Sequence, residues 1–151
     1  MLFNFQVPLY LAAESATEQV VVSGHGADEL FGGYHRYKKM NDKEFLRKSK
    51  EDVLALAEGD AGDARALVAS AGHMLSTPYL DPNIIEYGLG LPRASRTEKK
   101  IIHDLVEELG FSPRKKKAAQ FGSGSAKLLT RIAKKEGVSE EELIQRYAVS
   151  P

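Results

Sequence analysis

The pattern of hydrophobic and polar positions predicts a helical chain with very little strand. Apolar residues recur three or four positions apart along most of the sequence, which is typical of helices that bury one face. Helices are expected at 9–16, 43–50, 51–58, 64–73, 83–91, 98–109, 126–136 and 140–148, with a linker at 59–63. Glycines follow several of these segments, as expected at helix ends.

Two stretches near the N-terminus have strand-like patterns. Residues 2–7 alternate apolar with polar side chains before Pro8, which favours a short strand or an extended arm. The three valines at 20–22 favour a buried strand, because β-branched residues pack well in sheets. No other stretch offers a comparable strand, so the edges of this one would invite a partner. Pro78 and Pro82 favour extended backbone in the segment around them.

The valine strand leads into a loop rich in glycine and acidic residues. Gly24 and Gly26 let the backbone turn tightly and bring its N–H groups near an anion, as phosphate-binding loops do. Asp28 and Glu29 follow, and a carboxylate there could hold Mg²⁺ against phosphate oxygens. The same residues also suit an ordinary turn and an acidic helix start. The pattern alone therefore leaves a nucleotide loop and a plain turn both open.

Composition narrows the classes of partner. Lys plus Arg and Asp plus Glu each number 21, so a net charge of zero provides no overall attraction to nucleic acid or to an anionic membrane. The sequence has no cysteine, which excludes disulfides and thiolate metal sites. No apolar stretch reaches membrane-spanning length, and residues 1–13 lack the features of a signal peptide. We therefore expect a cytoplasmic protein with no membrane partner and no nucleic-acid partner.

Two C-terminal features have more than one interpretation. Residues 112–124 form a basic run that ends in a glycine loop, and such a run alone is usually a solvated surface. The two helices expected at 126–148 predict a hairpin, with Gly137 at the turn and Ser139 and Glu142 as a capping box. The turn also resembles that of a helix-turn-helix DNA reader, but glutamates at 140–142 would face phosphates that repel them. A hairpin without DNA is the simpler interpretation.

The order of the residues from Ser23 to Tyr34 is more informative about function than their composition. It reads Ser-Gly-His-Gly-Ala-Asp-Glu-Leu-Phe-Gly-Gly-Tyr and resembles the second nucleotide-site motif of the synthetase domain of asparagine synthetases, differing from it only at His25. The segments at 77–82 and 112–124 resemble further elements of that family, in the same order. We therefore expect a family-like domain fragment over residues 1–125 and a C-terminal helical hairpin over 126–151.

The resemblance implies a fold and an activity. The fold would be mainly α with one or two strands, as the C-terminal half of an α/β adenine-nucleotide-hydrolase-like domain. The activity would belong to an ATP-dependent, AMP-forming amide ligase that converts aspartate to asparagine through β-aspartyl-AMP, with ammonia as the amine and Mg²⁺ as the cofactor of ATP. By motif position, Ser23 and Gly24 would contact the nucleotide and Asp28 would ligate Mg²⁺. Lys99, or its neighbour Lys100, would stabilise the departing pyrophosphate.

The sequence also departs from the family pattern. His25 stands where the family has a glutamate linked to acyl-adenylate formation, which makes it a candidate catalytic base without a fixed negative charge. Met74 and Ser76 replace a glutamate and an arginine that family members often show. The chain has no Ser-Gly-Gly-x-Asp-Ser pyrophosphate loop and no N-terminal cysteine for glutamine hydrolysis. We therefore expect a ligase half that works with a partner chain carrying that loop, or that self-associates; the alternative is a non-catalytic binding or assembly module.

Overall fold

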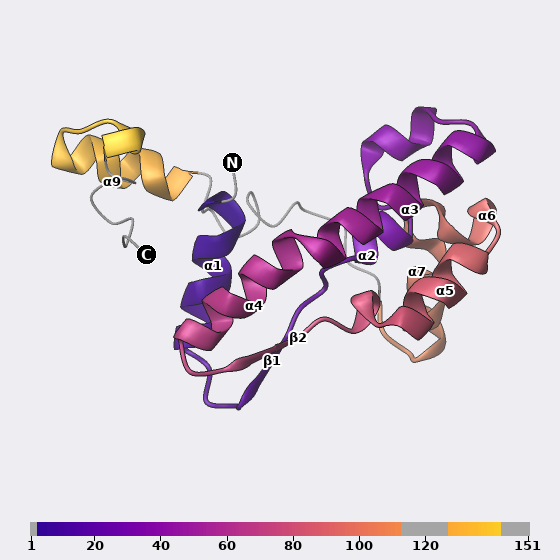
Figure 1. Cartoon of the computed structure of the whole chain (residues 1–151), viewed down its shortest axis with the longest axis horizontal. Helices are drawn as coiled ribbons and strands as arrows, with labels where there is room; N and C mark the ends of the chain where they lie inside the picture. The colour runs from indigo at the N-terminus through magenta and orange to yellow at the C-terminus, as the bar shows by residue number, and fades with distance from the viewer. Residues whose placement is uncertain (1–2, 113–126, 143–151) are drawn as a thin grey trace. The chain divides into compact units, whose positions relative to one another are not determined.

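The computed structural model describes residues 3–112 and 127–142. The chain divides into two compact units, one of residues Ala13–Arg114 and one of the segments Met1–Ala12 and Lys115–Pro151. The first unit contains the glycine-rich loop and is mainly helical (Figure 1). Its elements are β1 (Val20–Val22), α2 (Ala27–Leu30), η1 (His35–Lys39), α3 (Asp42–Glu58), α4 (Asp60–Ser70), β2 (Met74–Ser76), η2 (Pro78–Leu80), α5 (Pro82–Gly90), α6 (Arg93–Arg96), η3 (Thr97–Lys99) and α7 (Lys100–Glu108).

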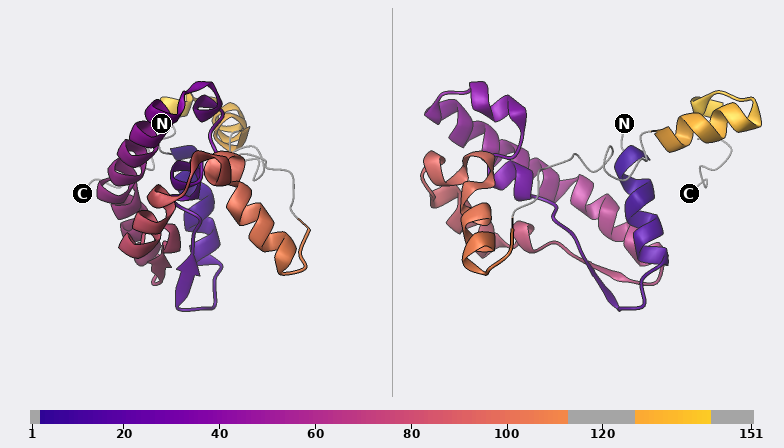
Figure 2. Two further views of the ribbon diagram at one scale, coloured as in Figure 1. Left: turned by 90° about the vertical axis from the view of Figure 1, so that its right-hand side faces the viewer. Right: turned by 180° about the vertical axis from the view of Figure 1, so that it is seen from behind.

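The two strands form a parallel sheet; they are labelled in Figure 1, and Figure 2 gives two further views of the same ribbon. Val20 pairs with Met74, and Val22 pairs with Ser76. Parallel strands need a long crossover, and here α2, η1, α3 and α4 supply it. The mainly helical fold with one or two strands is thereby confirmed. The sequence missed β2 because Met-Leu-Ser lacks β-branched residues and is very short.

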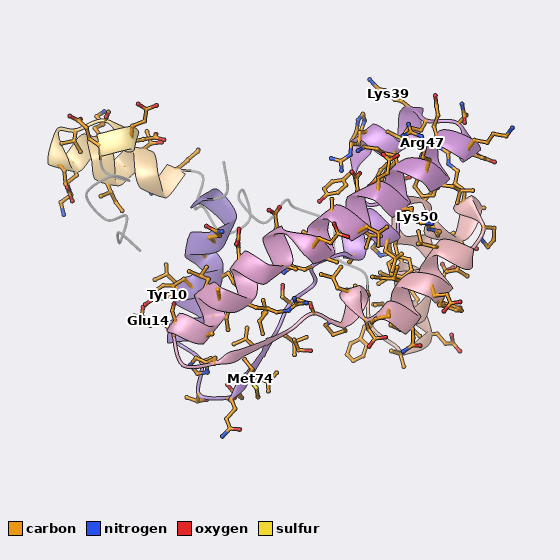
Figure 3. The ribbon with its side chains drawn as sticks, viewed as in Figure 1. Tyr10, Glu14, Lys39, Arg47, Lys50 and Met74 are labelled. Atoms are coloured by element: carbon orange, nitrogen blue, oxygen red, sulfur yellow. The ribbon has the colours of Figure 1, made fainter. Side chains whose placement is uncertain are left out.

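The two faces of this sheet differ in exposure. Val20, Val22 and Met74 share one face, and their side chains are 43%, 69% and 62% exposed. Val21 and Leu75 lie on the opposite face and are half-buried. The helix α4 packs beside β2, and Met74 lies on the side of the strands away from α4 (Figure 3). The prediction that the valine strand is buried was therefore wrong for one of its faces.

The core of this unit lies where α2 and α6 pack against α3. Phe45 is buried edge-on to Tyr37, with ring centroids 5.4 Å apart. Leu30 is fully buried, and a Cβ atom on Gly88 would lie 2.7 Å from its Cγ atom. Helix α5 therefore approaches α2 so closely only because Gly88 has no side chain. A neighbouring cluster consists of Val53, Ala61 and Leu80.

Several predicted boundaries were wrong, each for a local reason. The helices expected at 43–50 and 51–58 are one helix, α3, because no glycine or proline separates them. Asn41 caps this helix, in a capping box with Glu44. The segment 59–63, expected as a linker, mostly belongs to α4, whose first turn contains Asp60 and Asp63. Acidic residues in a first turn favour a helix, and here they outweigh the glycine beside them.

The extended conformations expected beside prolines are present only in part. Asp81, which precedes Pro82, is extended as predicted, but Thr77 before Pro78 has a ψ of 75°, outside the extended region, and 78–80 form the short 3-10 helix η2. The segment before Pro8 is helical: α1 spans Phe3–Glu14 and includes this proline, so the predicted strand was wrong. Proline fixes φ at a helical value, so it costs this helix one hydrogen bond without imposing an extended chain.

The second unit contains the helix α9, Leu128–Glu136. Gly137 ends it with φ of 68°, and Ser139 and Glu142 form the predicted capping box. The remainder of the expected second helix and nearly all of the basic run at 112–124 lie outside the described residues. Among the helices that the structure describes, none is long and apolar enough to cross a membrane.

Candidate functional site

The glycine-rich loop begins at the carboxyl end of β1. The Ser23 backbone N–H donates to the Ser76 carbonyl oxygen at 2.9 Å, which ties the start of the loop to the end of β2. The carboxyl ends of both strands therefore meet at one edge. Ligands of α/β domains bind outside this edge, so the loop lies where such a domain holds its ligand.

The first two glycines of this loop have different roles. A Cβ atom added to Gly24 would meet no atom within 4 Å, so the loop faces open space at this residue. A Cβ atom on Gly26 would lie 2.5 Å from Cδ2 of Leu80, and its φ of +91° is in the left-handed region. Gly26 is therefore required by the fold, whereas Gly24 leaves room for a ligand to approach the backbone.

The structure brings together two residues that the sequence predicted as site residues. The Nζ atom of Lys99 lies 2.9 Å from Oδ1 of Asp28, and both side chains are partly exposed. A Cβ atom on Gly33 would lie 1.8 Å from that carboxylate oxygen and 2.7 Å from Cε of Lys99. Only a glycine leaves space for the ion pair at this position. Lys100 instead pairs with Asp104, so Lys99 is the lysine that contacts Asp28.

Helix α2 holds Lys99 in place through the carbonyl groups at its carboxyl end. A helix leaves its last carbonyls without intrahelical partners, and α2 has only four residues. Four successive carbonyl groups at and just beyond this helix end accept hydrogen bonds. The Glu29 carbonyl accepts from Ser49 Oγ (2.8 Å), and the Leu30 carbonyl accepts from Arg96 Nε (2.8 Å). The Phe31 carbonyl accepts from the Lys99 N–H (2.8 Å), and the Gly32 carbonyl accepts from the Glu98 N–H (3.2 Å). The segment 96–99 is thus docked, by its backbone and one side chain, on the helix that carries Asp28.

The backbone of this docked segment is strained. Glu98 and Lys99 have φ values of 56° and 60°, in the left-handed region that side chains other than glycine rarely adopt. Each such residue costs about 1–3 kcal/mol and persists only where its surroundings impose it. The bonds to α2 and an ion pair between Lys38 and Glu98 impose it here. Lys99 was predicted in the first turn of a helix, but it is the residue that precedes α7.

His25 lies beside Ser23 in the loop. Ser23 Oγ and His25 Nδ1 share a hydrogen bond of 2.5 Å. Burial lowers the pKa of His25, and the charge of Arg65 acts in the same direction while that of Asp60 opposes it. The imidazole is therefore neutral at neutral pH, as a base must be. Sequence reasoning missed Arg65, which donates to Thr77 Oγ1 at 3.2 Å from an exposed helix face.

Glu29 is buried and bonded within the protein, whereas its neighbour Asp28 is partly exposed. The Glu29 side chain is 8% exposed and accepts a hydrogen bond of 2.5 Å from the Tyr34 hydroxyl. Burial and this bond raise the pKa of Tyr34. Asp28 is consequently the carboxylate of the loop that is placed to meet a ligand.

The Asp28 carboxylate suits a cation that is also bound by the phosphates of a ligand, rather than a cation bound by protein side chains alone. Among the described residues, no group of three or more His, Cys, Asp or Glu side chains could hold a metal ion. Mg²⁺ commonly binds through one or two carboxylates together with substrate phosphates. Asp28 beside an open glycine loop matches that second arrangement.

Comparison with known proteins agrees with the geometry of this loop. Residues 3–76 match the asparagine synthase family model. Proteins similar to this chain include asparagine synthetases and an asparagine synthetase domain-containing protein. The matched segment includes the glycine loop and both strands, and it ends before Lys99.

Three homologues show how much of such a protein this chain represents. A Methanocaldococcus jannaschii protein assigned as a glutamine-hydrolysing asparagine synthetase is 28% identical over 91% of this chain and 34% of its own length. An asparagine synthetase domain-containing protein of Saccharomyces cerevisiae is 28% identical over 78% of this chain and 23% of its own length. Asparagine synthetase 1 of Arabidopsis thaliana is 29% identical over 67% of this chain and 19% of its own length. The chain thus spans about a third or less of these relatives.

Proposed function

We propose that this chain supplies one half of the nucleotide site of an asparagine-synthetase-type amide ligase, as the C-terminal part of its synthetase domain. The observation that carries the proposal is the Asp28–Lys99 ion pair beside an open glycine loop at the carboxyl edge of a parallel sheet. Carboxylate, ammonium and open backbone are the groups that binding of a magnesium nucleotide requires.

In this proposal each residue of the site has one task. Ser23 and Gly24 bind the nucleotide, because the loop is open at Gly24. Asp28 would hold Mg²⁺, which neutralises phosphate charge when bound. Lys99 places its ammonium against the pyrophosphate that leaves when the aspartate side chain attacks the α-phosphate of ATP to give β-aspartyl-AMP. A positive charge that is already in place stabilises the negative charge that develops on the pyrophosphate in the transition state of that step.

His25 is the proposed base for the amine in the second step. It would accept a proton from ammonia as the nitrogen attacks the acyl carbon and AMP leaves. Its bond to Ser23 orients the ring, and its lowered pKa keeps it unprotonated at neutral pH. Ammonia and aspartate are therefore the proposed substrates.

The rest of the site would come from a second polypeptide that pairs with β1. The backbone groups of Gln19 and Ser23 point to β2. The Gln19 carbonyl accepts from the Met74 N–H, and the Ser23 N–H donates to the Ser76 carbonyl, both at 2.9 Å. Because backbone groups alternate along a strand, those of Val20 and Val22 point to the outer edge. Parallel sheets are covered on both faces, yet this one exposes Val20, Val22 and Met74. The edge and this face together suit a further strand and its helix.

Calorimetric titration of the whole chain with Mg-ATP tests the proposal. The wild type is expected to bind, and Lys99→Ala to bind at least about tenfold more weakly, which corresponds to about 1.4 kcal/mol. Lys100→Ala is the matched control, because Lys100 pairs with Asp104 and should leave the affinity unchanged. No binding by the wild type, or equal losses in both variants, would contradict the proposal.

Catalysis is tested separately from binding. Mixing the chain with a polypeptide that carries a Ser-Gly-Gly-x-Asp-Ser loop should produce aspartate-dependent exchange between ATP and pyrophosphate. Mg-ATP binding without exchange in such mixtures would favour the alternative, a non-catalytic binding module. The substitution of the family glutamate by His25 is the observation that favours this alternative.

A further inference from the structure

Arg96, at the end of α6, is a fully buried charged residue in the core beside the site. None of its surface is exposed, and its guanidinium carbon lies 4.8 Å from the centre of the Phe45 ring. Nε donates to the Leu30 carbonyl at 2.8 Å, and one terminal nitrogen donates to Ser49 Oγ. The other terminal nitrogen, Nη1, is buried without a hydrogen-bond partner in the part of the chain that the structure describes.

Stability alone is a poor explanation for a guanidinium in this environment. Burial disfavours the charged form and lowers the pKa of Arg96. An unpartnered buried N–H group is unfavourable, and well-packed apolar side chains often replace buried charges without loss of stability. The residue therefore fits a role in placing other groups better than a role in holding the core together.

The groups that Arg96 touches are those that fix the distance between Asp28 and Lys99. Its side chain bonds to the carboxyl end of α2, the helix that carries Asp28. Its backbone begins the strained segment 96–99, which ends at Lys99. Ser49, its second partner, donates to the Glu29 carbonyl, so the same helix end is held from two directions.

We propose that Arg96 is a positioning residue, which locks α2 to the segment 96–99 and thereby holds the Lys99 ammonium at the Asp28 carboxylate. Its importance for nucleotide binding rests on the proposed function, whereas the lock itself is a property of the fold. Without Arg96, the left-handed conformations of Glu98 and Lys99 lose part of what imposes them. Lys99 would then sample positions away from the loop.

Arg93 provides a matched control on the same helix. Its guanidinium lies 5.3 Å from the centre of the same Phe45 ring. It donates to Asp42 at 2.8 Å and to the Tyr37 carbonyl at 3.2 Å, and these partners lie outside α2. Arg93→Met therefore removes a cation from the same aromatic ring without releasing α2.

Amide hydrogen exchange of the whole chain, followed by NMR, tests the lock without any ligand. Arg96→Met should lower the protection of the Glu98 and Lys99 amides at least about tenfold relative to the amides of α3, since local opening exposes only these bonds. Arg93→Met should leave them unchanged. Equal protection at residues 98 and 99 in wild type and Arg96→Met, or a uniform loss throughout α3, would overturn the proposal.

Arg96→Lys is the second variant if Arg96→Met does not fold. Lysine keeps the charge, but its single nitrogen cannot reproduce the guanidinium fork that reaches Leu30 and Ser49 together. Its expected result is the same selective loss of protection at Glu98 and Lys99. Full retention of protection in this variant would show that charge alone suffices, which would contradict the lock.

A double-mutant cycle on Mg-ATP affinity tests the link to the site. Arg96→Met should weaken binding at least about fivefold when Lys99 is present and have no further effect in a Lys99→Gln background, because positioning requires the positioned group. Additive losses would mean that Arg96 acts independently of Lys99, which would overturn its positioning role. If the wild type binds no Mg-ATP, the proposed function fails, and the amide exchange result still decides the lock.

Discussion

The ammonium of Lys99 lies 2.9 Å from the carboxylate of Asp28, and Gly33 leaves the space that both side chains fill. Each group therefore partly neutralises the other when no ligand is bound. A cation held by Asp28 would compete with the ammonium, and Lys99 would then be available to phosphate. The two events are coupled by one pair of atoms, so substitutions at either residue should change the dependence of nucleotide binding on Mg²⁺.

Asp28→Asn should weaken the binding of Mg-ATP about tenfold and leave the affinity for ATP in EDTA within about twofold of the wild type. The amide keeps the shape of the side chain but is a poor ligand for Mg²⁺. Calorimetric titration in both buffers measures the two affinities. Asp104→Asn, which removes the partner of Lys100, is the control. A parallel loss of affinity in both buffers would show that Asp28 acts on the fold and not on the cation.

Gly33→Ala and Gly24→Ala should separate the fold of the loop from its contact with ligand. The methyl group at residue 33 would overlap Asp28 Oδ1, so this variant should lose about 1–3 kcal/mol of stability together with nucleotide binding. The methyl group at residue 24 meets nothing within 4 Å. That variant should unfold like the wild type but bind Mg-ATP more weakly. Urea unfolding and calorimetry measure the two effects, and unchanged affinity in Gly24→Ala would count against nucleotide contact there.

Local signals in the sequence were sufficient for much of the helical framework. Capping at Asn41, the glycine ends at Gly110 and Gly137 and the box at Ser139 each depend on neighbours within one turn. The strand β2 and the helical start of the chain were missed because they depend on more than local pattern. A three-residue strand such as Met74–Ser76 exists only because β1 lies beside it.

The candidate site was predictable only where a motif is contiguous. Ser23, Gly24 and Asp28 belong to one run of sequence, and their placement follows from one strand and one helix start. Only the family resemblance assigned Lys99 to the site, and its contact with Asp28 was not predicted. Arg96 and Ser49 were missed altogether, because a buried arginine and serine on separate helices have no pattern in a single sequence. Their roles depend on which carbonyls a short helix leaves unpaired.

The environment of His25 predicts a loss of stability in mild acid. Its pKa in the folded chain lies below the ordinary value of 6.5, so the unfolded chain binds the proton first as the pH falls. Its contribution therefore becomes destabilising as the pH falls through about 6.5 toward the folded pKa. His25→Gln should make the free energy of unfolding less dependent on pH between about 7.5 and 5.5. Urea unfolding at several pH values measures this, and equal slopes for variant and wild type would contradict it.

The exposed face of β1 predicts how the chain associates. Val22 is 69% exposed, so Val22→Lys should change the free energy of unfolding by no more than about 0.5 kcal/mol. If this face receives another polypeptide or a second copy, the charge should prevent that association. Phe111→Lys is a matched control, because Phe111 is 68% exposed and lies outside the sheet. Light scattering across a range of concentrations, alone and with the partner polypeptide, measures the association. Loss in Val22→Lys but not in Phe111→Lys supports β1 as the interface, and equal behaviour of the two variants contradicts it.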